Sequence, residues 1–439
     1  MAFGKVYTEQ APALAVPLGY WLAALCGGAA LMGWIAAHAD PVWHAAWGTP
    51  AVLAAVHLFT LGWMTPMMLG SLTQWLPVVT NRPGMGHGRG SEGAKVATAA
   101  YLLGVGLLVA GMARWDFAWA AVGGSLLAVA VGWHLALHSR QLFTARPFPV
   151  PLGFVAAGQA SLGVAVGLGL GMALGLARGR PVSWTTVGTH LTAGLGGWFL
   201  LTLIGVSYKL FPMFSPSRRE PRWGWLVLAW TLLVLLLTVG WVVARGGWPR
   251  WWLCTWWGPW GLYAADLFAT WRQRRSHRLD PAVLAMLAAV ASLLAVPALK
   301  LAGSPLAAAW LFAFGGLGLA SLAYFSKILP FALWHHRFRQ RPGPGLLVPH
   351  VADILPPKTV WPTLVGWTGG VAVAVLGAWW RQRWAWEIGL GCQGLALGHG
   401  LLQAFWAIGR SRPRPAQTGN TGIERRLGTT ERSGTTHGR

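Results

Sequence analysis

Two histidines of this chain begin related apolar stretches, where an imidazole could bind a metal or a haem iron. His57 opens HLFTLGWMTPMMLGSLTQWLPVV, and His190 opens HLTAGLGGWFLLTLIGVSYKLFPMF. An ionisable residue inside an apolar segment is costly and therefore commonly marks a site. Imidazole is also a common axial ligand of haem. His57 and His190 are thus candidate haem or metal ligands. The alternative is that a neighbouring carbonyl group or a water satisfies each of them.

The two stretches share a repeated pattern, in which Gly follows Trp after seven residues and Pro follows after seven more. Its positions are Trp63, Gly70 and Pro77, then Trp198, Gly205 and Pro212, and in a weaker third copy Gly316, Ala323 and Pro330. Such self-similarity predicts a repeat architecture. His57 precedes its proline by 20 residues and His190 by 22, so their depths are similar. An offset of two residues turns a helical side chain by about 200°, so one shared site and two separate sites both stay open.

Composition predicts an all-α polytopic membrane protein. Of 439 residues, 55% are hydrophobic and 10% are charged, and mean hydropathy is +0.49. A membrane-spanning helix needs about 20 apolar residues. We predict about twelve transmembrane helices, near 12–37, 50–77, 94–112, 117–138, 150–177, 184–213, 224–244, 250–271, 281–302, 305–334, 360–381 and 384–409.

The distribution of Lys and Arg predicts the orientation. With the N-terminus inside, 24 of the 34 lie on the inner side and 8 in outer loops, as the positive-inside rule requires. We therefore expect a multi-pass protein of the cytoplasmic (inner) membrane with both termini cytoplasmic. Residues 1–409 form the transmembrane domain, and 410–439 form a disordered basic tail with almost no apolar residues. The net charge of +23 suits the lipid bilayer and its anionic inner leaflet and needs no nucleic acid.

Other polar side chains in the predicted helices form a second set of candidates. His399 lies between two glycines, where a bulky group could approach the backbone, and is a further candidate ligand. Asp266 is expected at a depth similar to that of Lys209 and Lys327, so it should pair with one of them. Alternatively, the lysines extend to the inner headgroups. The pairs most simply explained by an interfacial or solvated position are His134 with His138 and His335 with His336.

Twelve helices with a weak threefold repeat, together with LGWMTPMMLGSLTQWLPVV and GVSYKLFPMF, resemble subunit I of the haem–copper oxidase superfamily. The similarity is to a short, divergent branch near the cbb-type oxidase and nitric oxide reductase catalytic subunits. It implies a haem-copper-oxidase-like bundle and a cytochrome or quinol donor, or another respiratory subunit, as partner. In the family, helix 2 carries a low-spin haem ligand, which maps onto His57. Helix 6 carries a copper ligand, which maps onto His190.

Two departures from the family pattern change the expected chemistry. The family has a His-His pair on helix 7 and two haem-ligating histidines on helix 10. Here 224–244 and 305–334 contain no histidine, and 308–310 read Ala-Ala-Trp. We therefore predict haem, of unknown type, without copper. His399 would replace the lost helix 10 ligand.

The function expected from these residues is electron transfer, or respiration related to nitric oxide or oxygen, without a complete haem–copper centre. Whether the chain is an enzyme stays open. A membrane transporter and an oxidase-like accessory or assembly subunit without cofactor remain alternatives, because repeats and interrupted helices are also usual in transporters.

Overall fold

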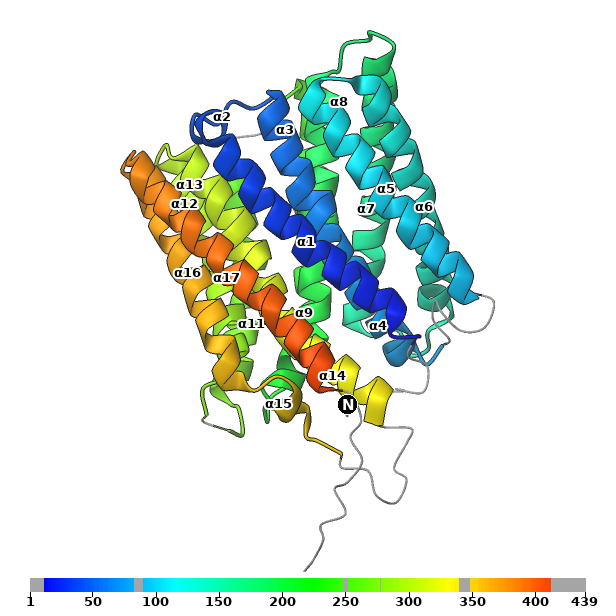
Figure 1. Cartoon of the computed structure of the whole chain (residues 1–439), viewed down its shortest axis with the longest axis vertical. Coiled ribbons are helices and arrows are strands. Elements are labelled where there is room, and N and C mark those ends of the chain that lie inside the picture. Colours follow the sequence, from blue (N-terminus) through cyan, green and yellow to red (C-terminus); the bar gives the residue numbers. More distant parts are fainter. Residues whose placement is uncertain (1–11, 83–89, 248–251, 277, 339–347, 412–439) are drawn as a thin grey trace, which may run out of the picture.

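The computed structural model describes residues 12–82, 90–247, 252–276, 278–338 and 348–411, and these residues form helices and no strand. The helices stand side by side in one bundle (Figure 1). The first residue of α1 and the last residue of α17 lie at the same end of it (Figure 1). The tail predicted to be disordered lies outside the described residues from residue 412 onward.

Ten helices of the described chain are long and apolar enough to cross a membrane, so the chain is a multi-pass membrane protein. They are α1 (Ala15–Ala37), α3 to α4 (Pro50–Thr80), α5 (Gly90–Arg114), α6 (Phe117–Thr144), α7 (Val150–Ala177), α8 to α9 (Trp184–Phe214), α10 (Gly224–Arg245), α12 (Pro281–Leu301), α13 to α14 (Pro305–Phe338) and α16 (Pro357–Trp379). Two further long helices, α11 (Trp252–Arg272) and α17 (Arg383–Arg410), complete the bundle, with the short α2 (Ala39–Trp43) and α15 (Val351–Ile354).

Local sequence explains where these helices begin. Proline occupies the first turn of several of them, where its missing N–H has no helical partner to lose. Other helices start at a capping side chain that accepts backbone N–H groups. These caps are Asp116 for α6, Ser183 for α8 and Asp280 for α12.

Each copy of the sequence repeat contains a π-helical segment. These segments are η2 (Leu58–Met64), η3 (Thr192–Leu201) and η4 (Leu311–Gly318). They separate α3 (Pro50–His57) from α4 (Thr65–Thr80), α8 (Trp184–Leu191) from α9 (Thr202–Phe214), and α13 (Pro305–Trp310) from α14 (Leu319–Phe338). Glycine, a weak helix former, occurs in all three. Mid-helix π segments occur frequently at functional sites.

Side chains of neighbouring helices bind carbonyl groups of two π segments. The hydroxyl of Tyr101 donates to the Leu61 carbonyl oxygen at 2.8 Å. The indole N–H of Trp367 donates to the Phe314 carbonyl oxygen at 3.0 Å. A side chain inserted into the helical ladder is a known cause of such irregularities. These contacts therefore stabilise the widened turns.

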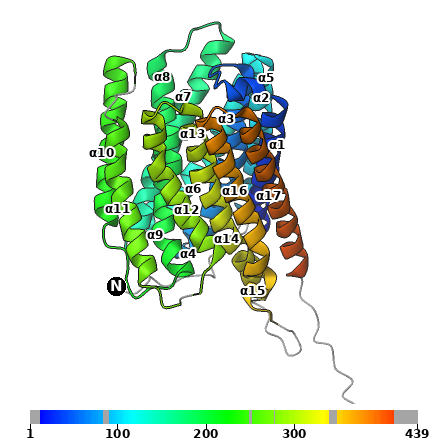
Figure 2. The ribbon, with the colours of Figure 1, turned by 90° about the vertical axis from the view of Figure 1, so that its left-hand side faces the viewer.

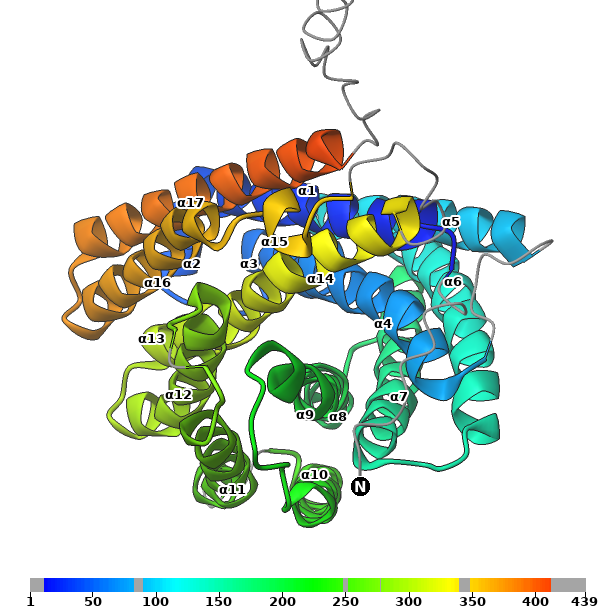
Figure 3. The same cartoon turned by 90° about the horizontal axis from the view of Figure 1, so that it is seen from below.

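The three interrupted helices form the centre of the bundle. In the most apolar window of each, 61% to 78% of the residues are buried, against at most 50% in the other membrane-spanning helices. Around them the packing repeats: α1 packs on η2, α7 on η3 and α12 on η4. The next two helices of each unit pair with one another, as α5 with α6, α10 with α11 and α16 with α17. Figure 3 shows the last two of these pairs at separate rims. The sequence repeat thus corresponds to three four-helix units.

Candidate histidine site between the first two units

His57 is the last residue of α3, directly before η2. Helix α3 begins at the end of the bundle opposite the start of α1 (Figure 1), and His57 lies seven residues from that beginning, or about 10 Å along the helix. Its Nδ1 is 2.8 Å from the Leu53 carbonyl oxygen one turn earlier. A carbonyl can only accept, so Nδ1 carries the proton and Nε2 keeps a free lone pair. That tautomer suits a metal ligand.

His190 has the same tautomer, fixed by a different helix. It lies on α8, six residues from its start, and its Nδ1 is 2.9 Å from the carbonyl oxygen of Ala165 on α7. Gly169 makes room for the ring, because a Cβ at that position would lie 3.1 Å from Cε1 of His190. The Nδ1 proton therefore points at α7, and Nε2 is again left with a lone pair.

The structure places His57 and His190 in the same region of the bundle. They lie close enough to interact electrostatically, although they occupy positions of the repeat that differ by two residues. Both side chains are half-buried. Neither Nε2 has a hydrogen-bond partner among the described residues, and neither is sealed from solvent. Two imidazoles whose Nε2 lone pairs are free of protein partners are donors of the type that haem iron takes.

A metal held wholly by protein side chains fits this site less well. The described residues contain no group of three or more His, Cys, Asp or Glu side chains that could surround one ion. A structural metal site usually needs about four such donors. The pair at His57 and His190 alone would therefore leave such an ion short of protein donors.

The third unit has an indole where the first unit has His57. Trp310 directly precedes η4, as His57 directly precedes η2. Its ring centre is 4.5 Å from that of Phe314 and 5.1 Å from that of Trp386. Phe59 and Trp63 of η2 also pack on Phe314, at 5.6 and 6.4 Å. Aromatic rings therefore fill the contact between η2 and η4, so a haem between these two segments does not fit.

His399 does not join the pair. It lies 16 residues into α17, about 24 Å from the helix start, so it is much deeper than His57. Its side chain is exposed on the bundle, and its Nδ1 is 2.8 Å from the Thr363 hydroxyl of α16. Its role as a replacement ligand stays a prediction.

The expected pairing of Asp266 with a lysine was wrong. Asp266 is fully buried and binds Arg219 at 3.1 Å, from the loop between α9 and α10. Lys327 instead forms an ion pair with Asp280, and Lys209 interacts electrostatically with Glu220. The expected depth of each residue in the membrane did not predict these partners. Arg219 and Glu220 lie in a loop, and Asp280 caps the start of α12.

Two other histidine pairs were assigned to the wrong environment. His134 and His138 are fully buried, because α6 continues to Thr144, past its expected end at residue 138. Tyr20 contacts His134 Nε2 at 2.5 Å, and the Gln159 amide contacts His138 Nδ1 at 3.0 Å. Similarly, α14 continues to Phe338 and buries His335. The four-residue spacing of His134 and His138 was the available signal for a shared buried face.

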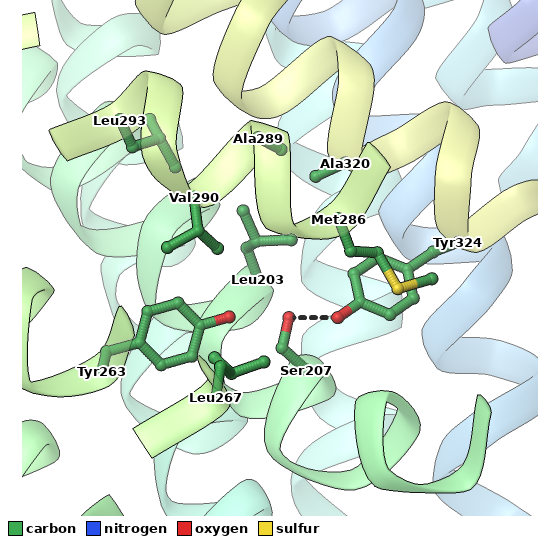
Figure 4. A pocket seen from close by; sticks show the side chains of 10 residues that line it. All are labelled: Leu203, Ser207, Tyr263, Leu267, Met286, Ala289, Val290, Leu293, Ala320 and Tyr324. Carbon is green, nitrogen blue, oxygen red and sulfur yellow. Dashed lines mark hydrogen bonds between the residues drawn. The ribbon is translucent and has the colours of Figure 1, made fainter. Parts of the chain in front are cut away.

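A second set of polar side chains lies around a small internal cavity between α9, α11, α12 and α14. Figure 4 shows the hydroxyls of Tyr263 and Tyr324 directed toward Ser207. Tyr324 donates to Ser207 at 2.7 Å. The rest of the lining is apolar, and the space holds about one water molecule. The cavity is therefore too small for a cofactor.

Comparison with known proteins does not assign this chain to a family. No protein-family model matches the chain, and no curated protein matches it in sequence.

Proposed function

We propose that this protein is a haem-binding membrane protein that transfers electrons or handles nitric oxide. The observation that carries the proposal is the pair of accessible Nε2 lone pairs at His57 and His190, each prepared by an Nδ1–H bond to a carbonyl group. The carbonyl partner raises the basicity of the imidazole and fixes the ring orientation. The resemblance to haem–copper oxidase subunit I supports the same assignment.

In this proposal each residue has a defined role. Bound haem iron would supply reversible one-electron chemistry. His57 and His190 would hold it through Nε2, while Leu53 and Ala165 keep the protons on Nδ1. Gly169 leaves space for the His190 ring. Below the pair, the indole of Trp198 donates to the Thr65 hydroxyl at 3.1 Å, which joins the first two central helices.

We further propose that α11 and α17 also cross the membrane, which gives twelve spans with both termini inside. Both are long enough, with 21 and 28 residues. The concentration of Lys and Arg on one side supports the orientation. A periplasmically active reporter fused after Trp47 should be active, whereas one fused after Arg410 should be silent. The opposite pattern would invert the orientation.

Reduction of oxygen or nitric oxide by a haem–copper centre is not part of the proposal. Copper in such a centre needs about three imidazoles, and α10 and α13 to α14 up to residue 334 contribute none. We expect no stoichiometric copper beside a high-spin haem. Purified protein should not consume oxygen with reduced cytochrome or quinol. Robust reduction of oxygen or nitric oxide by the purified protein would instead indicate a catalytic member of the superfamily.

An absorption spectrum tests the main proposal. Protein purified from cells supplied with haem precursor should show a Soret band that shifts on reduction. A six-coordinate haem should shift little with carbon monoxide. Absence of any Soret band from folded protein would contradict haem binding.

The second candidate function is an accessory or assembly subunit without cofactor. It is favoured by one observation: aromatic side chains fill the contact between η2 and η4, so this part of the molecule serves as a packed scaffold. Folded, haem-free protein that co-purifies with a respiratory complex would support this candidate instead.

A further inference from the structure

Two loops at the end of the bundle where α1 starts are tied together. One joins α9 to α10 and the other joins α11 to α12. Backbone hydrogen bonds connect them, from Arg218 N to the Gln273 oxygen at 3.1 Å and from Arg275 N to the Pro216 oxygen at 2.8 Å. Ser217 and Arg274 also form an isolated antiparallel bridge. The loops therefore present their side chains from one fixed surface.

Buried Asp266 fixes the same surface from below. Besides Arg219, it accepts hydrogen bonds from the backbone N–H groups of Arg222 and Trp223, each at 3.0 Å. A fully buried carboxylate with this many donors stabilises a single loop conformation. Arg222 is consequently held at the start of α10 with its side chain exposed.

The carboxylates of this region are already engaged. Asp266 binds Arg219, Asp280 binds Lys327, and Glu220 interacts with Lys209. Exposed arginines of the tied loops and of the adjacent helix end have no ion pair or side-chain hydrogen bond within the described chain. They are Arg218, Arg222, Arg272, Arg275 and Arg278. We name them the arginine cluster.

An apolar, aromatic face begins directly beside the arginine cluster. The guanidinium of Arg274 lies 4.2 Å from the centre of the Trp271 ring. Trp223 and Trp225 are exposed at the start of α10. Exposed leucines then continue along that helix, at Leu226, Leu233, Leu236 and Leu237. Figures 2 and 3 place α10 and α11 side by side at the rim of the bundle.

We propose that the arginine cluster binds the phosphate headgroup of an anionic phospholipid whose acyl chains lie along α10. Arginine matches phosphate geometry through paired N–H donors. Basic sites at the cytoplasmic ends of transmembrane helices recognise such headgroups. Because α10 crosses the membrane, a lipid can contact the arginines and the leucine face together, whereas a nucleic acid or an acidic protein would contact the arginines alone.

Lipid retention in nanodiscs tests the site. Wild-type protein should retain phosphatidylglycerol over phosphatidylcholine in native mass spectrometry. In the variant Arg218→Gln/Arg222→Gln/Arg275→Gln, affinity for phosphatidylglycerol should fall about a hundredfold, since each cation near a membrane surface contributes roughly fivefold. The matched control is Arg178→Gln/Arg180→Gln/Arg245→Gln, three exposed arginines at the opposite end, which should retain the lipid.

Several outcomes would overturn the proposal. These are equal retention by both triple variants, no preference for phosphatidylglycerol, or displacement of the lipid by millimolar inorganic phosphate alone. Tight binding of a short RNA that blocks the lipid would also do so. If the triple variant unfolds, Arg275→Gln alone should lower retention about fivefold, and 0.5 M salt should weaken retention by wild-type protein.

Discussion

The contact of the first π segment with the second unit differs from its contact with the third. Toward the second unit, His57 and His190 are half-buried, and their Nε2 atoms are free. Toward the third unit, Phe59 and Trp63 pack against Phe314. The helices on both sides have the same interruption at the same position of the repeat.

This difference separates the role of the backbone from that of the side chains. All three π segments widen a helix at the same depth, yet only the first two carry an imidazole beside the widening. In the third, Trp310 packs on Phe314 and Trp386. The backbone therefore provides three similar positions, and side-chain identity decides which of them can bind a ligand and which serve packing.

Removal of either imidazole should produce the largest change. His57→Ala and His190→Ala should each lower haem content below about a tenth of wild type, because each removes one axial bond. His44→Ala is the control, since His44 is exposed and its imidazole interacts with Asp40, four residues earlier. Pyridine haemochrome absorbance measures the content. If each variant loses only half of the haem, the pair occupies two sites rather than one. Wild-type content in both would refute the assignment.

Truncation of the aromatic contact should lower stability without changing the spectrum. Phe314→Ala removes a 4% exposed ring and should lower the free energy of unfolding by about 3–5 kcal/mol. Phe143→Ala, at a position 76% exposed, should change it little. Thermal unfolding in detergent gives the comparison. A loss of haem from folded Phe314→Ala protein would show that the two regions are coupled.

An imidazole placed in the third unit should not create a second haem site. Trp310→His puts the imidazole at the position equivalent to His57, but Phe314 and Trp386 still surround it. We expect unchanged haem content and a loss of stability of about 3 kcal/mol from the smaller side chain. An additional equivalent of haem would show that side-chain identity alone determines binding.

The smallest expected effect is a loss of stability from a substitution where α1 approaches η2 closely. A Cβ at Gly27 would lie 2.1 Å from the Gly62 carbonyl oxygen, whereas nothing lies within 4 Å of one at Gly33 on the same helix. Gly27→Ala should therefore cost about 1–3 kcal/mol, and Gly33→Ala should be neutral or slightly stabilising. Equal melting temperatures would mean that η2 tolerates displacement and that the His57 position is not rigid.

Apolar runs were sufficient to place the helices, because a bilayer requires a minimum apolar length. Helix ends were less predictable: polar residues such as Arg140 suggested an interface, but α6 continues beyond them. The π segments were not predicted, since they depend on side chains of other helices, such as Tyr101 and Trp367. The tautomer of His190 also depends on a tertiary contact, with the Ala165 carbonyl of α7, whereas that of His57 is fixed within its own helix by Leu53. The histidines themselves were visible in the sequence, but their proximity was not.

Asp266 has a consequence for how the chain enters the membrane. Its carboxylate lies on α11 yet binds the loop that starts α10. If α11 crosses the membrane as proposed, this helix on its own would carry an unpaired charge into the lipid, at a cost of up to about 3 kcal/mol. We expect α10 and α11 to leave the translocon as one hairpin, with the charge neutralised by Arg219 before either helix meets lipid alone. The order of insertion of this part of the protein would then be set by a single buried ion pair.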